Sequence, residues 1–184
     1  MRSRMGSLVA VGTLTLAGFS AVAWATQDKF AVQVPGGISL GECRGYDDWA
    51  AVSVSHPQGS KEKLNLIVAN PTMIDAYRAG IPGNGQAFPD GSKTVKVSWH
   101  PEASKVAPFV VQEPEKLLGV GCMVKDSKRF ADTGSWGYGQ FTYDPATDTF
   151  APDTIAQGND ATCGAACHQA AAATDYVFTS YGKR

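Results

Sequence analysis

The stretch that decides the fold is TVKVSW at residues 94–99, in which polar and apolar side chains alternate at every position. In an extended chain the two valines and the tryptophan fall on one side, and Thr94, Lys96 and Ser98 fall on the other. A repeat of two residues is typical of a β-strand whose faces meet different surroundings. The sequence therefore predicts a half-buried strand at residues 94–99.

The segments on either side of this strand extend the same pattern. A compact apolar run and two further strand-like runs predict strands at residues 64–69, 117–124 and 136–143. Helices are predicted at residues 46–52, 73–79 and 167–173, and an irregular connection at residues 101–114. Strands joined by short loops, without a regular strand–helix–strand rhythm, indicate an antiparallel sheet. We expect an α+β, mainly β fold with a few peripheral helices.

The first 25 residues have the composition of a secretory signal peptide. Arg2 and Arg4 precede an apolar, uncharged run at residues 8–24, and Ala23-Trp24-Ala25 is a small-x-small cleavage site. A retained membrane anchor is the alternative, although the run is short for a span and contains several glycine, serine and threonine residues. We therefore predict a signal peptide at residues 1–25, a single domain at residues 26–184, and a periplasmic location.

Charge and hydropathy narrow the classes of partner. Loss of Arg2 and Arg4 would change the formal net charge from -1 to -3. The sequence has no basic stripe of the kind that binds nucleic acid, and residues 26–184 contain no second apolar run of membrane length. We expect neither a nucleic-acid partner nor a membrane span after the signal peptide is cleaved.

The motif that carries chemistry is CGAACH at residues 163–168. Two cysteines within reach of the two vinyl groups of a haem, with a histidine after the second, are typical of c-type haem attachment. The usual spacing has two residues between the cysteines, and this chain has three. A longer spacing is tolerated chemically, because one extra residue can bulge out while Cys167-His168 keeps its geometry. A disulfide, half of a zinc site and a redox dithiol are the alternatives. We predict one covalent haem c per chain, tethered by Cys163 and Cys167, with iron held by His168.

The other cysteines, histidines and methionines give weaker signals. Cys43 and Cys122 lie far apart in the sequence, and in an exported protein they form either a disulfide or two buried thiols. The two other histidines stand beside prolines, as surface residues often do. Met73 and Met123 fit core positions, and neither is a strong sixth ligand. The iron would then be open on one side, as binding and catalysis require.

Several segments resemble the cytochrome P-460 family. They are FPDG at residues 88–91, MVKDSKRF at residues 123–130, WGY with QF between residues 136 and 141, and DYVFT at residues 175–179. Together with Cys167-His168 they follow the family order across most of residues 26–184. The resemblance implies a mainly antiparallel sheet with peripheral helices, and a homodimer.

The resemblance also implies two functions that a lysine distinguishes. Cytochrome P-460 proper oxidises hydroxylamine, and a lysine side chain is bonded to its haem macrocycle. The related cytochromes c′-beta lack this bond and bind nitric oxide and similar gases at an open iron. In the family a lysine follows Phe-Pro-Asp-Gly within the strand, which favours Lys96 over Lys93 as the cross-linking residue.

The function expected from the resemblance is hydroxylamine oxidation to nitrogen oxides at a five-coordinate iron, with electrons passing to a small cytochrome. Nitric oxide binding without turnover is the alternative, and an electron carrier closed by Met123 is a third. Hydroxylamine oxidation needs a group that removes protons. Three acidic residues lie around the predicted pocket strand and are candidates for this base, namely Glu113, Glu115 and Asp126. Arg44 is a candidate for orienting a bound ligand. The sequence singles out none of the four.

Overall fold

The computed structural model describes residues 28–57, 59, 63–155 and 163–182. The predicted signal peptide and its cleavage site lie outside these ranges and stay a prediction. None of the helices within the described ranges is long and apolar enough to cross a membrane.

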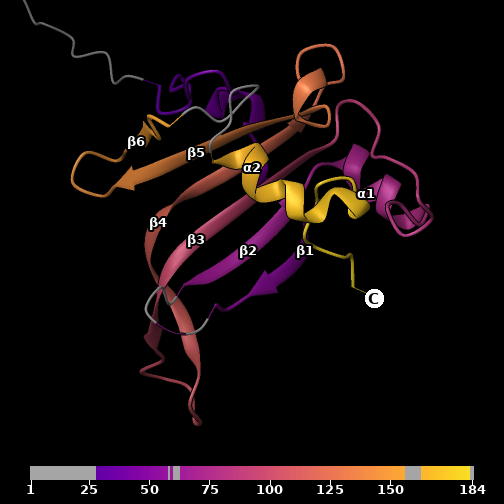
Figure 1. The fold of residues 1–184 in the computed structure, drawn as a ribbon. Coiled ribbons are helices and arrows are strands. Elements are labelled where there is room, and N and C mark those ends of the chain that lie inside the picture. Colours follow the sequence, from indigo (N-terminus) through magenta and orange to yellow (C-terminus); the bar gives the residue numbers. More distant parts are fainter. Residues whose placement is uncertain (1–27, 58, 60–62, 156–162, 183–184) are drawn as a thin grey trace, which may run out of the picture.

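The described part of the chain forms one antiparallel sheet of six strands, in which each strand pairs with the next in the sequence (Figure 1). The order is β1-β2-β3-β4-β5-β6. Within the described ranges the sheet is accompanied by two α-helices, α1 between β2 and β3 and α2 after β6, and by four short 3-10 helices, so the predicted mainly β, α+β class is confirmed. The strands are β1 (Ala50–Ser55), β2 (Leu64–Ala69), β3 (Lys93–Ala103), β4 (Gln112–Lys125), β5 (Trp136–Asp144) and β6 (Thr149–Pro152), and the helices are α1 (Pro71–Arg78) and α2 (Gly164–His168).

One face of the sheet packs against the N-terminal segment. Val95 and Val97 of β3 join a buried cluster with Ile38 and Leu40, which precede β1. A disulfide joins Cys43 of this segment to Cys122 of β4, at a separation of 79 residues. Cys122 is also fully buried. It is therefore both a core residue and a disulfide partner, the two roles considered for it from the sequence. The apolar residues that alternate along β3 therefore face a buried hydrophobic core, as predicted.

The opposite face of the sheet carries α1 and the C-terminal segment. Asn70 begins α1 by accepting a hydrogen bond from Met73 N at 3.1 Å, and Pro71 occupies the first turn, where its missing N–H costs nothing. Met73 is fully buried against this face. In Figure 1 the C-terminal helical segment, drawn yellow, runs across the sheet beside α1. The N-terminal segment therefore covers one face of the sheet, and α1 with the C-terminal segment covers part of the other.

The predicted helix at residues 46–52 is wrong. A short 3-10 turn covers Tyr46–Asp48, and β1 begins at Ala50. The aspartates suit a first turn, but Val52 and Val54 favour extended backbone, and pairing with β2 supplies the hydrogen bonds that a helix would have made. Tertiary pairing overrides the local pattern at this edge of the sheet.

The predicted irregular connection at residues 101–114 is wrong at both ends. The β3–β4 pairing continues to Ala103 opposite Gln112, so the two strands form a long hairpin that projects beyond the sheet (Figure 1). Pro101 lies opposite Pro114. Neither strand pairs with a second strand at this point among the described residues, so the missing proline N–H groups remove no hydrogen bond to a third strand. The strand β6 was also not predicted.

Candidate functional site

A cavity of about 400 Å³ lies between the partly covered face of the sheet and the C-terminal segment. Its walls come from β1 to β5, from α2 and from the chain after Tyr176. The cavity brings together all but one of the residues singled out from the sequence for haem attachment. Its lining includes Lys96, Gly121, Gln140, Cys163, Cys167 and His168.

Lys96 enters the cavity because of the strand register. It pairs with Gly121 of β4, which in turn pairs with Gln140 of β5. These side chains share one face of the sheet, opposite the apolar face of β3. A Cβ atom on Gly121 would lie 3.0 Å from the Gln140 Oε1 and 3.7 Å from the Lys96 Cε. Glycine at this position keeps the cavity floor open between the two polar side chains.

Lys93 does not lie in this cavity. Its Nζ donates a hydrogen bond of 2.6 Å to the Glu42 carbonyl oxygen, in the N-terminal segment. An odd separation along a strand places side chains on opposite faces, so Lys93 and Lys96 diverge. The geometry therefore separates the two candidates for the cross-link, although it leaves the link itself a prediction.

The two cysteines lie one helical turn apart. Cys163 precedes α2, and Cys167 N donates a hydrogen bond of 3.0 Å to the Cys163 carbonyl oxygen. Three intervening residues give the i, i+4 spacing that brings two side chains to one side of a helix. The three residues between the cysteines lie in the first turn of α2 and form no bulge in this structure. Both thiols are free, so the structure does not join them as a disulfide.

One backbone carbonyl and two aromatic rings hold the His168 side chain in one orientation. Its Nδ1 lies 2.6 Å from the Tyr176 carbonyl oxygen, which can only accept, so Nδ1 carries the hydrogen. The ring centroid lies 5.0 Å from that of Tyr138 and 4.8 Å from that of Phe178. The Nε2 lone pair is then the one available to a metal.

The surroundings lower the pKa of both basic groups. Burial lowers the pKa of His168, the Lys96 charge lowers it further, and the hydrogen bond to Tyr176 opposes this trend. The pKa of Lys96 is also lowered, chiefly by desolvation and then by the charge of Lys63. Solvent reaches Lys96 through the cavity mouth, yet the walls remove enough water to produce this shift. A neutral amine is a nucleophile, and a neutral imidazole is a metal ligand.

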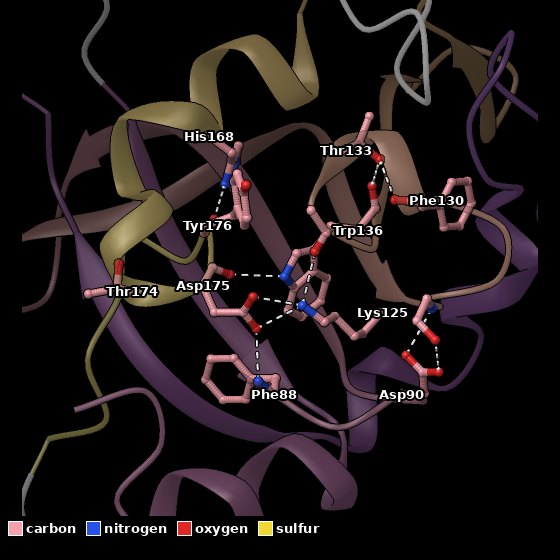
Figure 2. Close-up of polar contacts among 12 residues, drawn as sticks. Phe88, Asp90, Lys125, Phe130, Thr133, Trp136, His168, Thr174, Asp175 and Tyr176 are labelled. Atoms are coloured by element: carbon pink, nitrogen blue, oxygen red, sulfur yellow. Dashed lines mark hydrogen bonds and ion pairs between the residues drawn. The ribbon is translucent and has the colours of Figure 1, made fainter. Parts of the chain in front are cut away.

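The carbonyl that holds His168 sits on a turn with unusual backbone (Figure 2). Asp175 and Tyr176 have φ angles of 50° and 64°, in the left-handed region, which costs an L-residue about 1–2 kcal/mol. Lys125 Nζ donates to both carboxylate oxygens of Asp175, at 2.7 and 2.9 Å. The Phe88 N–H adds a bond of 2.8 Å to the same carboxylate, and Trp136 Nε1 donates at 2.9 Å to the Asp175 carbonyl.

Gly134 makes room for this turn. A Cβ at this position would lie 2.1 Å from Cε2 of the Tyr176 ring, and the φ angle of 67° also favours glycine. The Gly134 carbonyl accepts a third hydrogen bond from Lys125, at 3.0 Å. The sequence prediction missed the roles of these residues. The segments at residues 123–130 and 175–179 carried the family resemblance and contain Lys125 and Tyr176, but they gave no indication of the backbone geometry.

The acidic residues considered as a distal base do not line the cavity. Glu113 and Glu115 lie on the projecting part of β4 and are exposed. Asp126 accepts backbone hydrogen bonds from the turn after β4, and Arg44 pairs with Asp28. Met123, the alternative sixth ligand, is buried and does line the cavity. Within the described ranges no group of three His, Cys, Asp or Glu residues could hold a metal ion by itself.

The donor set fits a haem. Two free thiols one helical turn apart and an imidazole with a fixed tautomer border one cavity, beside a lysine with a lowered pKa. Tyr138 adds a buried hydroxyl without a hydrogen-bond partner among the described residues. Burial raises its pKa, so the hydroxyl remains a hydrogen-bond donor. Cys163 and Cys167 would hold the group covalently, and His168 would hold its iron.

Comparison with known proteins agrees with this geometry. A family model described as Cytochrome P460 matches residues 43–179, from the disulfide cysteine to the segment after His168. No curated protein matches the chain. The matched region contains the whole sheet, both cysteines of the attachment motif and the histidine. The chain belongs to the cytochrome P460 family, and the family implies that it binds haem.

Proposed function

We propose that this chain is a periplasmic haem c oxidoreductase that oxidises hydroxylamine, with Lys96 bonded to the haem macrocycle. The observation that carries the proposal is the position of Lys96 in the wall of the cavity that Cys163, Cys167 and His168 also line. When bound, the haem supplies an open iron position and accepts electrons. The residues of the chain attach it, orient it and perturb it.

Each residue has a distinct part in this proposal. Cys163 and Cys167 form the thioether tethers, and His168 donates Nε2 to the iron because Nδ1 is engaged by Tyr176. Lys96 would hold the macrocycle through an additional bond from its amine, and its lowered pKa makes the neutral form of the amine more available. Gln140 presents a polar side chain beside Gly121 in the same cavity and could bind hydroxylamine by hydrogen bonding.

The proposal includes partners that fit the family. The mature protein would act as a homodimer after cleavage of residues 1–25. Electrons removed from hydroxylamine would pass to an electron-accepting cytochrome. The expected products are nitrogen oxides.

The test compares two lysine variants of the mature holoprotein. Lys96→Met removes the amine, and Lys93→Met is the matched control, because Lys93 bonds to Glu42 on the other side of the sheet. The reduced parent protein should show a strongly red-shifted Soret band. Lys96→Met should keep its haem, lose the red shift and lose hydroxylamine turnover, whereas Lys93→Met should keep all three. A Lys96→Met protein with unchanged spectrum and turnover would contradict the proposal.

A second candidate function is the binding of nitric oxide or a similar gas without turnover. The observation that favours it is the neutral character of the walls near Lys96, which Ile67, Met123 and Phe178 help to form. Such walls suit an uncharged diatomic ligand better than a reaction that releases protons. A reduced protein that binds nitric oxide and carbon monoxide but never turns over hydroxylamine would establish this alternative.

A further inference from the structure

A buried ion pair lies one residue from the backbone carbonyl that holds His168. We propose that Asp175, paired with Lys125, is a positioning residue that fixes the hydrogen bond to His168 and thereby lowers the redox potential of the haem iron. This inference rests on the proposed function, because it requires His168 to be the iron ligand.

The turn needs an anchor because its backbone is unfavourable. Asp175 and Tyr176 both have positive φ angles, and two adjacent non-glycine residues rarely adopt this region without external support. The Tyr176 carbonyl lies 2.6 Å from Nδ1 of His168 only while the turn keeps this shape. A relaxed turn would rotate the carbonyl away from the ring.

The anchor engages both the side chain and the backbone of Asp175 (Figure 2). Lys125 binds both carboxylate oxygens, and the Phe88 N–H binds one of them. Trp136 Nε1 binds the carbonyl of the same residue. The charged side chains are 6% and 10% exposed, so water does not compete for these bonds. Asp175 is thus fixed from three other parts of the chain.

The hydrogen bond that results controls the electron density on the imidazole. A ring that donates Nδ1–H strongly becomes a more basic ligand through Nε2. A more basic ligand stabilises ferric over ferrous iron, because the oxidised metal carries the greater charge, and so lowers the potential. Weakening the anchor should raise the potential and weaken the bond between iron and histidine.

The experiment compares Asp175→Asn with Asp90→Asn in the holoprotein. Asp90 is a nearby exposed carboxylate that accepts two hydrogen bonds from Ser127, at 2.9 and 2.6 Å. It feels the Lys125 charge but is not one of the groups that Lys125 Nζ binds, so it controls for the loss of one negative charge alone. Asp175→Asn should shift the potential to more positive values and lower the iron–histidine stretching frequency of the ferrous protein in resonance Raman spectra. Asp90→Asn should leave both close to the parent values, and an equal or smaller shift in Asp175→Asn would overturn the inference.

A second variant covers the case in which Asp175→Asn does not accumulate with haem. Trp136→Phe removes the hydrogen bond to the Asp175 carbonyl, keeps an aromatic ring beside Phe88 and Lys125, and leaves both charged members of the ion pair in place. It should change both readouts in the same direction by a smaller amount, and no change would again overturn the inference. A parent protein without an iron–histidine band would instead refute the proposed function. The two failures are therefore distinguishable.

Discussion

Replacing Lys125 with methionine should destabilise the protein severely. The Lys125 ammonium makes three hydrogen bonds of 2.7–3.0 Å, two of them to the Asp175 carboxylate. The two side chains are 6% and 10% exposed, so the carboxylate could not recover its lost partner from water. Removing one member of a buried ion pair typically costs about 3–5 kcal/mol. For a chain of this length that corresponds to a fall in Tm of roughly 6–20 °C.

Urea unfolding of the mature holoprotein, followed by far-ultraviolet circular dichroism, measures this cost. Arg78→Met is the matched control, because its pair with Asp75 is 64% and 73% exposed and should contribute at most about 1 kcal/mol. The double variant Lys125→Met, Asp175→Asn should lose less stability than the sum of the single variants, because the second change removes the unpaired charge. A Lys125→Met protein as stable as Arg78→Met would refute the reasoning.

Two further predictions concern the turn and the N-terminal segment. Gly134→Ala should displace the Tyr176 ring, which a Cβ would approach to 2.1 Å. We expect a lower stability in urea unfolding and a weaker iron–histidine band in the resonance Raman spectrum. Unchanged values of both would contradict this expectation and show that the ring moves without moving the carbonyl. Glu42 has a lowered pKa despite its partial burial, because Arg129 and the Ser39 N–H bind its carboxylate. Its folded pKa lies below its unfolded value, so its stabilising effect is complete above the ordinary value of 4.5 and is lost as pH falls through the folded pKa. Glu42→Gln should therefore flatten the decline of stability below pH 4.5, and an equally steep decline would contradict this account.

The centres of the main strands were predictable because an apolar core on one face and a polar cavity on the other leave a period of two in the residue types, although Thr94 and Ser98 on the polar face are buried as well. The alternation at residues 94–99 and 136–143 reports faces that meet different surroundings, and β3 and β5 contain both segments. The edge strands β1 and β6 were not predictable, because a strand with one neighbour and partial burial lacks this signal. The outer part of the β3–β4 hairpin was hidden by its prolines, which are tolerated there because no third strand needs their hydrogen bonds.

The site was predictable only where side-chain type carries the chemistry. Cys163, Cys167 and His168 stand together in the sequence, so the motif alone suggested their roles. The preference for Lys96 came from the family resemblance, since periodicity describes only which face of the strand it occupies. The Tyr176 carbonyl could not be found in this way, because every residue has a carbonyl and only the left-handed turn directs this one at His168.

The central claim is that Lys96 is bonded to a haem that Cys163 and Cys167 also hold. Tryptic digestion of the mature holoprotein, followed by mass spectrometry of the haem-containing peptides, tests it most directly. An alkylated Lys96 resists trypsin, so the account predicts that the segment beginning at Thr94 remains uncleaved at Lys96 and stays joined through the haem to the segment containing both cysteines. Release of an unmodified peptide Thr94–Lys96 from haem-loaded protein would contradict the account.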